Sequence, residues 1–309
     1  MCVMLAPTIQ GVSAPVQRLL AILACALFAT TAVATEKAVK PKVSKASAVV
    51  DFTKDGDPIL QSTGALVLDP ATGHTLYSKN ADHVAPIASI TKVMTAMVVL
   101  DAKLPMDDAI EITADDIDMI KGTGSRLPIG AHFRRDDLMR LALMASDNRA
   151  ASALGRNYPG GLPAFVEAMN VKAKALGLTQ TRYVDSSGLS PGNVSSPQDL
   201  GKLVTAAAKY PLINEYSTTR AVNVTLPDSK KTLKFVNTNG LVRGSDWTIG
   251  LSKTGYISEA GKCLVMQAMI ANQPVVIVLL DSWGRLTRIG DANRIKKWLE
   301  KNPAKLVSG

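Results

Sequence analysis

Ser89 and Lys92 stand three positions apart, a spacing that could let a serine act as a nucleophile without a histidine. In a helix, residues i and i+3 lie on one face a turn apart, so the Lys92 amine could reach the Ser89 hydroxyl. A neutral amine there could take the proton of a serine that attacks an acyl carbon. Ser-x-x-Lys fixes only two positions, and it arises by chance in many chains. It predicts acyl-transfer chemistry only if the other parts of such a site are present.

Two further motifs follow in order, Ser146-Asp147-Asn148 and Lys253-Thr254-Gly255. Ser146 could relay a proton to a leaving amine, while Asn148 could hydrogen-bond a substrate peptide and help to fix Lys92. A second cation at Lys253 would lower the pKa of the Lys92 amine and favour its neutral form. Taken singly, each residue could be an ordinary surface serine, amide or charge. All of them together, in this order, are not expected by chance.

The third motif also carries groups that could bind a substrate. Lys253 and Thr254 present a positive charge and a hydroxyl to an anionic carboxylate. Gly255 would let a substrate backbone lie against a strand where a side chain would intrude. The backbone N–H groups of Ser89 and Tyr256 are the natural donors to an oxyanion.

The elements around the first motif are predicted from hydrophobic pattern and turn residues. Residues 64–69 and 74–78 read as a strand hairpin around the turn at 70–73. Residues 86–88 form the entry to a helix, and the apolar run 93–100 predicts that this helix is buried.

Helices are predicted for the middle of the chain. Residues 136–154 read as one helix that carries Ser146-Asp147-Asn148. A second helix covers 162–176 and is ended by Gly177, and a third begins at Ser196 with an N-terminal cap.

The last third of the chain changes to a strand-like period. Residues 247–256, 263–271 and 274–281 predict three antiparallel strands, and 291–301 predict an amphipathic closing helix. Strands at both ends with helices between them predict an α+β domain. Its antiparallel sheet would place the first and last segments side by side, flanked by helices and with a helical insert.

The N-terminal segment has the form of a secretory signal peptide. Arg18 precedes the apolar run 19–28, and the small residues that follow predict cleavage after Ala34. The run is too short for a comfortable membrane span. We therefore predict a signal peptide at 1–34, a mobile basic linker at 35–59, a catalytic domain at 60–301 and a tail at 302–309, in a periplasmic protein.

Composition narrows the class of partner. The chain has 35 basic and 26 acidic residues, a net charge of +9, which favours anionic surfaces such as a membrane or a bacterial wall. Export and an aromatic content of 5% exclude nucleic acid as the main partner. The three histidines, His74, His83 and His132, lack metal-ligand spacing, and Cys263 is predicted to be a buried core residue.

With these residues in hand, the chain resembles the serine D-Ala-D-Ala peptidases, the low-molecular-mass penicillin-binding proteins. Ser-x-x-Lys, Ser-Asp-Asn and Lys-Thr-Gly in this order are typical of penicillin-binding proteins and class A β-lactamases. Among these peptidases the chain is most similar to the penicillin-binding protein 7 type of D-alanyl-D-alanine endopeptidase. Beyond the motifs, the resemblance rests on residues 86–88, 141–151, 158–161, 168–170, 210–213, 217–220 and 237–239.

The resemblance implies hydrolysis of D-Ala to diaminopimelate cross-links between peptidoglycan stem peptides, and acylation by β-lactam antibiotics. No metal or organic cofactor is implied, and a loose association with membrane or wall is expected. A carboxylate-binding arginine near the last helix corresponds to Arg288, with Arg285 as the alternative. The chain departs from many carboxypeptidases at Asp147, where they carry glycine, and at Tyr256-Ile257, where they often carry His-Thr.

Other functions remain open from the sequence. A DD-carboxypeptidase is the nearest alternative, although the chain ends too soon after Gly255 for the extra β domain and membrane anchor of the penicillin-binding protein 5 type. A class A β-lactamase would need a deacylating glutamate, and Glu167 in Glu167-Ala168-Met169-Asn170 is one residue short of that pattern. A non-catalytic wall-binding protein is disfavoured by intact Ser89, Lys92 and Lys253. Cross-link preference, oligomeric state and regulatory partners are not predicted.

Overall fold

The computed structural model describes residues 51–226 and 231–307. The signal peptide predicted at 1–34 and most of the predicted linker lie outside these residues. Within them, the largest sheet has five strands in the order β2-β1-β11-β10-β9. Its strands are β1 Gly64–Leu68, β2 Thr75–Lys79, β9 Thr248–Ile257, β10 Gly261–Ile270 and β11 Gln273–Ser282.

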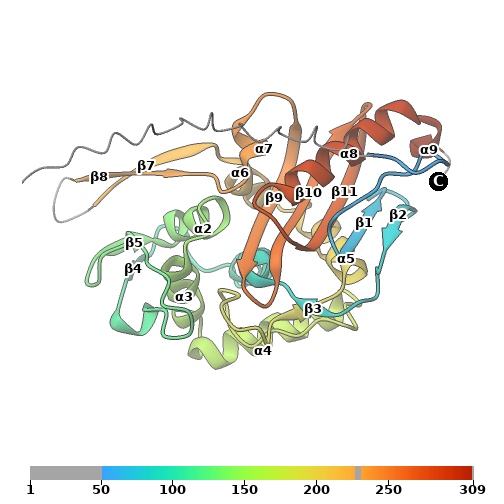
Figure 1. The fold of residues 1–309 in the computed structure, drawn as a ribbon. Coiled ribbons are helices and arrows are strands. Elements are labelled where there is room, and N and C mark those ends of the chain that lie inside the picture. Colours follow the sequence, from blue (N-terminus) through green and yellow to red (C-terminus); the bar gives the residue numbers. More distant parts are fainter. Residues whose placement is uncertain (1–50, 227–230, 308–309) are drawn as a thin grey trace, which may run out of the picture. The chain divides into compact units, whose positions relative to one another are not determined.

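The first and last strands of the chain lie side by side in this sheet (Figure 1). β1 pairs antiparallel with β11, so Leu66 stands opposite Val278. β10 then pairs with both β11 and β9, which leaves β9 at the sheet edge. The predicted α+β fold, with one antiparallel sheet closed by the two ends of the chain, is confirmed.

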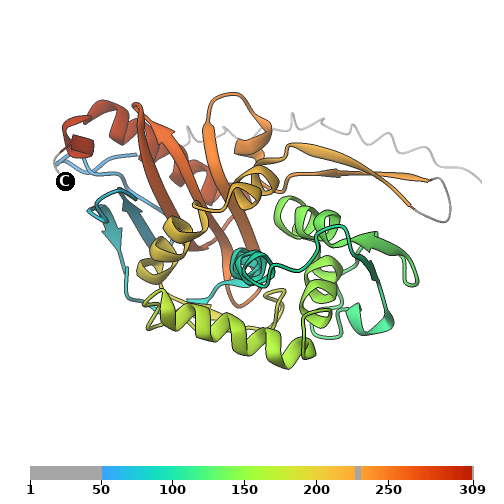
Figure 2. The same ribbon diagram turned by 180° about the vertical axis from the view of Figure 1, so that it is seen from behind.

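Alternation along the strands divides the core between the two faces of the sheet. Ala65 and Val67 face α8 (Thr287–Lys301), whose Ile295 and Trp298 are fully packed in the same cluster. Leu66 lies on the opposite face, in the larger cluster that contains the central helix α1 (Thr91–Asp101). Figure 2 shows α1, in teal, in the middle of the molecule. As its apolar run predicted, α1 is buried from Thr91 to Val99.

The second motif does not lie within one helix, and this prediction was wrong. The segment predicted as a helix over 136–154 divides into α2 (Arg135–Met144) and α3 (Asn148–Arg156). Ser146 between them has a left-handed backbone with φ 58°. Asp147 accepts a hydrogen bond from the Ala150 N–H at 3.0 Å and so caps α3. Serine, aspartate and asparagine favour caps over helix interiors, because their side chains compete for backbone hydrogen bonds.

The other predicted helices are present. α4 ends at Ala175, followed by Gly177 with φ 67°, and α5 is capped by the Ser196 hydroxyl, which accepts from the Asp199 N–H. The remaining helices are α4 Gly161–Ala175, α5 Pro197–Ala207, α6 Pro211–Thr218, α7 Gly240–Arg243, α9 Ala304–Val307 and the 3-10 turns η1 Ala88–Ile90 and η2 Ala114–Asp116.

Three small two-stranded sheets complete the fold. The hairpin of β7 (Ala221–Thr225) and β8 (Thr232–Val236) runs alongside α2 (Figure 1). The other pairs are β3 Ala85–Pro86 with β6 Val194–Ser195, and β4 Ala109–Glu111 with β5 His132–Arg134.

Both ends of the described chain pack more closely than the sequence predicted. Asp51, within the predicted linker, forms an ion pair with Arg294 of α8 at 2.8 Å. Leu306, within the predicted tail, is buried in the core cluster beneath α8. None of the helices in 51–226 and 231–307 combines the length and the apolar content that a bilayer crossing needs.

Candidate active site

Ser89 and Lys92 meet as their spacing predicted. Ser89 lies in the short turn η1, which leads directly into α1, and Lys92 lies in the first turn of α1. The Lys92 Nζ is 2.8 Å from the Ser89 Oγ. The amine also donates to the Asn148 Oδ1 at 2.7 Å and to the Ser187 carbonyl at 2.5 Å. Three acceptors therefore surround an amine whose side chain is fully buried.

Burial lowers the pKa of Lys92 to about 7, because a charged amine loses its hydration inside the protein. The carboxylates of Asp185, Asp147 and Asp118 act in the opposite direction and limit this shift. A substantial fraction of Lys92 is consequently neutral near pH 7. Asn148 and Ser187 can each accept one of the two remaining N–H bonds, which turns the nitrogen lone pair towards Ser89.

The second lysine is buried beside the second motif. Lys253 is buried, and its Nζ donates to the Ser146 Oγ and to the Thr254 carbonyl, both at 2.8 Å. Burial is the main cause that lowers its pKa well below the usual value, and the charges of Lys92 and Arg288 add to the effect. The lowered pKa of Lys92 thus follows from burial, whereas the sequence analysis attributed it to Lys253.

The residues of the second motif face in different directions. Ser146 contacts Lys253, and Asn148 links Lys92 to the hydroxyl of Thr123, to which it donates at 2.8 Å. Asp147 is half-buried, caps α3 and accepts from the Ser125 hydroxyl at 2.8 Å. The left-handed backbone at Ser146 is what separates these directions, because an uninterrupted helix would keep 146 to 148 on one continuous spiral.

The turn that carries Ser89 is held between two glycines. A Cβ on Gly188 would lie 2.0 Å from the Ala88 carbonyl oxygen, and Gly188 also has φ 82°. A Cβ on Gly255 would lie 2.9 Å from the Ile87 oxygen and 3.2 Å from the Ser89 nitrogen. Gly255 was predicted to let a substrate backbone lie against the strand. The structure gives a further reason for glycine here, since the chain's own turn η1 fills the space.

The loop that contacts Lys92 from the side opposite Asn148 was not predicted as part of the site. The Asp185 carboxylate accepts from the N–H groups of Ser187 and Gly188, both at 2.6 Å, and from the Ser190 N–H at 2.9 Å. It thereby aims the Ser187 carbonyl at Lys92. Asp-Ser-Ser-Gly is a sequence that indicates a turn, but nothing in it indicates which distant helix the turn contacts.

The open part of the site is a pocket of about 250 Å³. One residue of this pocket was not predicted, and a second was one of two alternatives. Thr238 shares a hydrogen bond of 2.6 Å with the Thr254 hydroxyl and was missed by the sequence analysis. Arg288 lines the pocket, while Arg285 is exposed and does not. The lining is Ser89, Ser146, Asn148, Thr238, Thr254, Gly255, Tyr256 and Arg288.

Arg288 also holds the edge strand in place. One of its terminal nitrogens donates to the Gly255 carbonyl at 2.9 Å and to the Cys263 carbonyl at 3.2 Å. Its Nε is buried and makes no hydrogen bond to any residue of 51–226 or 231–307. The first turn of α8 is therefore fixed above the Lys253-Thr254-Gly255 segment of β9, with donor capacity left over.

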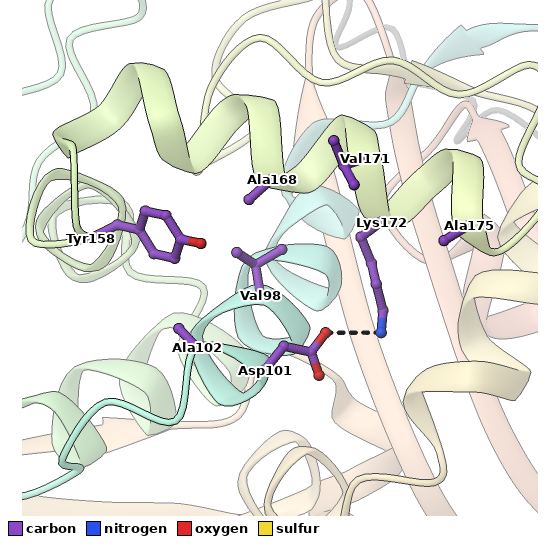
Figure 3. Close-up of a pocket in the computed structure, with 8 residues that line it drawn as sticks. All are labelled: Val98, Asp101, Ala102, Tyr158, Ala168, Val171, Lys172 and Ala175. Carbon is purple, nitrogen blue, oxygen red and sulfur yellow. Dashed lines mark ion pairs between the residues drawn. The ribbon is translucent and has the colours of Figure 1, made fainter.

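A second pocket lies between α1 and α4, away from these motifs (Figure 3). Asp101 and Lys172 form an ion pair of 2.8 Å in it, and the Tyr210 hydroxyl donates to Asp101 at 2.7 Å. It contains none of the predicted site residues. The Ser89 pocket, by contrast, brings a serine hydroxyl into contact with a buried amine of lowered pKa, which is the arrangement that attack on an acyl carbon needs.

Comparison with known proteins agrees with this chemistry. The sequence profile of the family described as D-alanyl-D-alanine carboxypeptidase matches residues 51–283. A protein of Pseudomonas aeruginosa named D-alanyl-D-alanine endopeptidase is 50% identical over 80% of this chain and 81% of its own. A protein of Escherichia coli with the same name is 46% identical over 80% of both chains.

Solved structures show the same fold. The DD-transpeptidase of Streptomyces K15 superposes with a TM-score of 0.73 at 29% identity, over 78% of this chain and 97% of that one. A D-alanyl-D-alanine carboxypeptidase of Mycobacterium tuberculosis superposes with a TM-score of 0.70 at 24% identity, over 78% and 91% of the two chains.

Proposed function

The chain belongs to the D-alanyl-D-alanine carboxypeptidase family, and on this basis we propose that it is a serine DD-endopeptidase of peptidoglycan. It would hydrolyse the bond between D-Ala and diaminopimelate in cross-linked stem peptides through an acyl-enzyme. The observation that carries the chemistry is the contact of Ser89 with Lys92, whose buried amine has a pKa of about 7.

Acylation begins at the Ser89 hydroxyl. The neutral Lys92 amine accepts the hydroxyl proton while the Ser89 oxygen bonds to the carbonyl carbon of D-Ala. The negative charge that develops on the carbonyl oxygen is stabilised by the backbone N–H groups of Ser89 and Tyr256. Asn148 and the Ser187 carbonyl keep the Lys92 lone pair aimed at Ser89 during the transfer.

Breakdown of this intermediate releases the amine of diaminopimelate. Ser146, which accepts a hydrogen bond from Lys253, relays to the leaving nitrogen the proton that Lys92 took from Ser89, so that Lys92 becomes neutral again. Water then attacks the ester at Ser89 while the neutral Lys92 accepts a proton from it, and this proton passes to the Ser89 oxygen when the ester bond breaks, which restores the free serine. Thr254 and Arg288 line the pocket and supply a hydroxyl and a positive charge that suit a substrate carboxylate, whereas Lys253 is buried outside the lining and contacts Ser146.

Similarity favours cross-links over terminal D-Ala as the target. Relatives named endopeptidases are 50% and 46% identical to the chain, while a relative named D-alanyl-D-alanine carboxypeptidase DacF, from Bacillus subtilis, is 30% identical. Carboxypeptidase activity is the second candidate, because the same acyl-enzyme forms when the leaving group is a free D-Ala.

Product analysis separates the two activities. We expect the protein to convert purified cross-linked stem-peptide dimers to monomers at least about tenfold faster than it removes D-Ala from monomeric pentapeptides, a difference equivalent to about 1.4 kcal/mol in transition-state binding. Chromatography of both digests measures the two rates. Release of terminal D-Ala with intact dimers would identify a carboxypeptidase instead.

A penicillin-hydrolysing function is disfavoured by the position of Glu167. This residue is exposed on α4, and it does not line the Ser89 pocket. Its neighbour Asn170 is engaged with the backbone of Tyr183, to which it both donates at 2.9 Å and accepts at 3.0 Å. We accordingly expect β-lactams to acylate Ser89 and to leave slowly, so that they inhibit the enzyme. The proposed location is the periplasm, with the cell wall as the partner.

Acylation should depend on pH through Lys92. Because the folded pKa of Lys92 is about 7, its neutral and reactive form increases as pH rises through that value. We expect the rate of acylation by a fluorescent penicillin to rise about tenfold from pH 6 to pH 8, following the neutral fraction of the amine. Stopped-flow or gel measurements give the profile, and circular dichroism checks that the fold is unchanged. A rate that stays level or falls over this range would contradict Lys92 as the base.

A further inference from the structure

Exposed apolar side chains are concentrated at the rim of the Ser89 pocket. Among the described residues, the five most exposed large hydrophobic side chains are Met119 at 87%, Trp283 at 75%, Leu286 at 68%, Tyr256 at 60% and Ile120 at 57%. Tyr256 itself lines the pocket. Exposed apolar residues scattered singly are ordinary, but a cluster beside a site indicates a surface that binds something. We call these five residues the rim.

Three of the rim residues lie at one end of the sheet. Tyr256 on β9 stands opposite Lys262 on β10, and Lys262 stands opposite Ser282, the residue before Trp283. The Lys262 amine lies 4.2 Å above the Tyr256 ring. Leu286 follows in the same connection, just before α8, whose Arg288 is tied to the Gly255 carbonyl. Tyr256, Trp283 and Leu286 therefore border the same side of the pocket.

The other two rim residues come from the helical side of the pocket. Asp118 accepts from the N–H groups of Ile120, Lys121 and Thr123, so it fixes the loop that carries Met119 and Ile120. Thr123 accepts in turn from the Asn148 side chain at 2.8 Å. Lys121 forms an ion pair of 2.5 Å with Glu259 in the turn between β9 and β10. The loop thus reaches across to the end of the sheet where Tyr256 lies.

We propose that the rim binds the saccharide chain from which the scissile stem peptide is suspended. This inference rests on the proposed function, because only a peptidoglycan substrate brings a glycan to this place. Two strand spacings separate Tyr256 from the start of the Trp283 connection, about 10 Å. A stem of four residues in extended form spans at most about 14 Å. A glycan joined to a stem bound at Ser89 can therefore reach Trp283.

The composition of the rim fits a sugar better than a lipid surface. Pyranose rings have apolar faces of C–H groups that stack on aromatic rings, while their hydroxyls need polar partners. Trp283 and Tyr256 supply rings, and Lys262 on β10 stands between their two strands. The ion pair of Lys121 with Glu259 adds a carboxylate and an amine that can hydrogen-bond sugar hydroxyls.

Paired substrates test the proposal. One is a cross-linked dimer that carries its disaccharides, and the other is the same dimer after an amidase has removed them. We expect Trp283→Ala to lower the ratio of the two kcat/KM values, disaccharide-bearing over sugar-free, by about fivefold to tenfold, the range expected for one lost aromatic stack. Trp283→Phe should restore part of the ratio because it keeps a ring.

Met269→Ala is the matched control. Met269 on β10 is an exposed apolar residue like those of the rim, with 42% of its surface exposed. It pairs with Thr248, at the end of the strand far from Tyr256. Its ratio should equal that of the wild type. The proposal would be overturned if Trp283→Ala left the ratio of the two kcat/KM values unchanged, either because both fall equally or because neither falls.

A binding measurement keeps the proposal testable without catalysis. Of the three tryptophans, Trp247 and Trp298 are buried at 9% and 1% exposure, so a change of fluorescence from a surface ligand reports on Trp283. Glycan chains stripped of stem peptides should change this emission in the wild type and not in Trp283→Phe. A response to anionic phospholipid vesicles and none to glycan would replace the sugar with a membrane.

The same titration separates this inference from the proposed function. If the wild type cleaves neither dimer while penicillin still acylates Ser89, the endopeptidase proposal fails. The glycan titration then decides the role of the rim by itself, with an unchanged emission as the negative result.

Discussion

Replacing Ser89 by alanine should abolish covalent labelling by a fluorescent penicillin and lower peptide hydrolysis by a factor of at least about 10³. The loss follows from the geometry, because Ser89 carries the oxygen that the buried Lys92 amine contacts at 2.8 Å. Without that oxygen, Lys92 has no hydroxyl to deprotonate and no acyl-enzyme can form. Labelling is read on a gel, and hydrolysis is read by chromatography of stem-peptide products.

Ser78→Ala is the matched control for this experiment. Ser78 is an exposed serine on β2, outside the pocket, so the variant should label at the wild-type rate. Thermal unfolding of both variants checks that neither change disturbs the fold. Persistent labelling of Ser89→Ala would mean that another residue is the nucleophile, and it would remove the basis of the proposed mechanism.

Gly188→Ala should be the most damaging single-methyl substitution near the site. The added Cβ would lie 2.0 Å from the Ala88 oxygen and 2.9 Å from the Ser89 nitrogen, so the turn η1 or the 185–188 loop must move. We expect a loss of at least about 3 kcal/mol in the free energy of unfolding, as for overpacked buried sites with unfavourable backbone. Because the same displacement moves Ser89 from the Lys92 amine, acylation should slow at least about tenfold.

Gly73→Ala isolates the backbone part of this effect. Gly73 has φ 76°, close to the 82° of Gly188, but a Cβ there meets nothing within 4 Å. We expect Gly73→Ala to lower the free energy of unfolding by only about 1–2 kcal/mol, because a residue with a side chain is strained in the left-handed conformation. Urea unfolding measures both variants, and penicillin labelling measures acylation. Equal losses in the two variants, with normal acylation, would show that Gly188 does not hold the Ser89 turn.

Local pattern was enough to predict most of the elements. The apolar run after Lys92 indicated a buried helix, and α1 is buried along most of its length. The strand-like segments near the C-terminus indicated three strands, and β9, β10 and β11 are those strands. These predictions succeeded because elements buried on all sides need continuous apolar runs, and the turn residues that bound each run separate strands from a helix.

The break between α2 and α3 was missed because both flanks carry a helical pattern. Apolar residues with helical spacing end at Ala145 and resume at Ala150, and the four polar residues between them are few enough to be one exposed turn of a continuous helix. The left-handed residue is Ser146 and not glycine, which removed the usual marker of a turn. Only the capping preference of Asp147 pointed to the break.

The sequence by itself determined the type of chemistry. A serine activated by a lysine needs a proton relay, a group that binds the substrate peptide and a second cation. The three motifs provide residues for these roles, so the sequence predicted one site made of Ser89, Lys92, Ser146, Asn148 and Lys253. The short spacing of Ser89 and Lys92 also predicted their contact, since residues three apart share a helix face.

The tertiary structure alone decided what makes that chemistry work. The pKa of Lys92 depends on burial by α3 and the Ser187 loop, which come from segments 56 and 95 residues further along the chain. Gly188 and Gly255 are likewise required by contact with η1 and not by their own neighbours in sequence. Desolvation and steric exclusion arise between surfaces that only folding brings together, and therefore no local pattern encodes them.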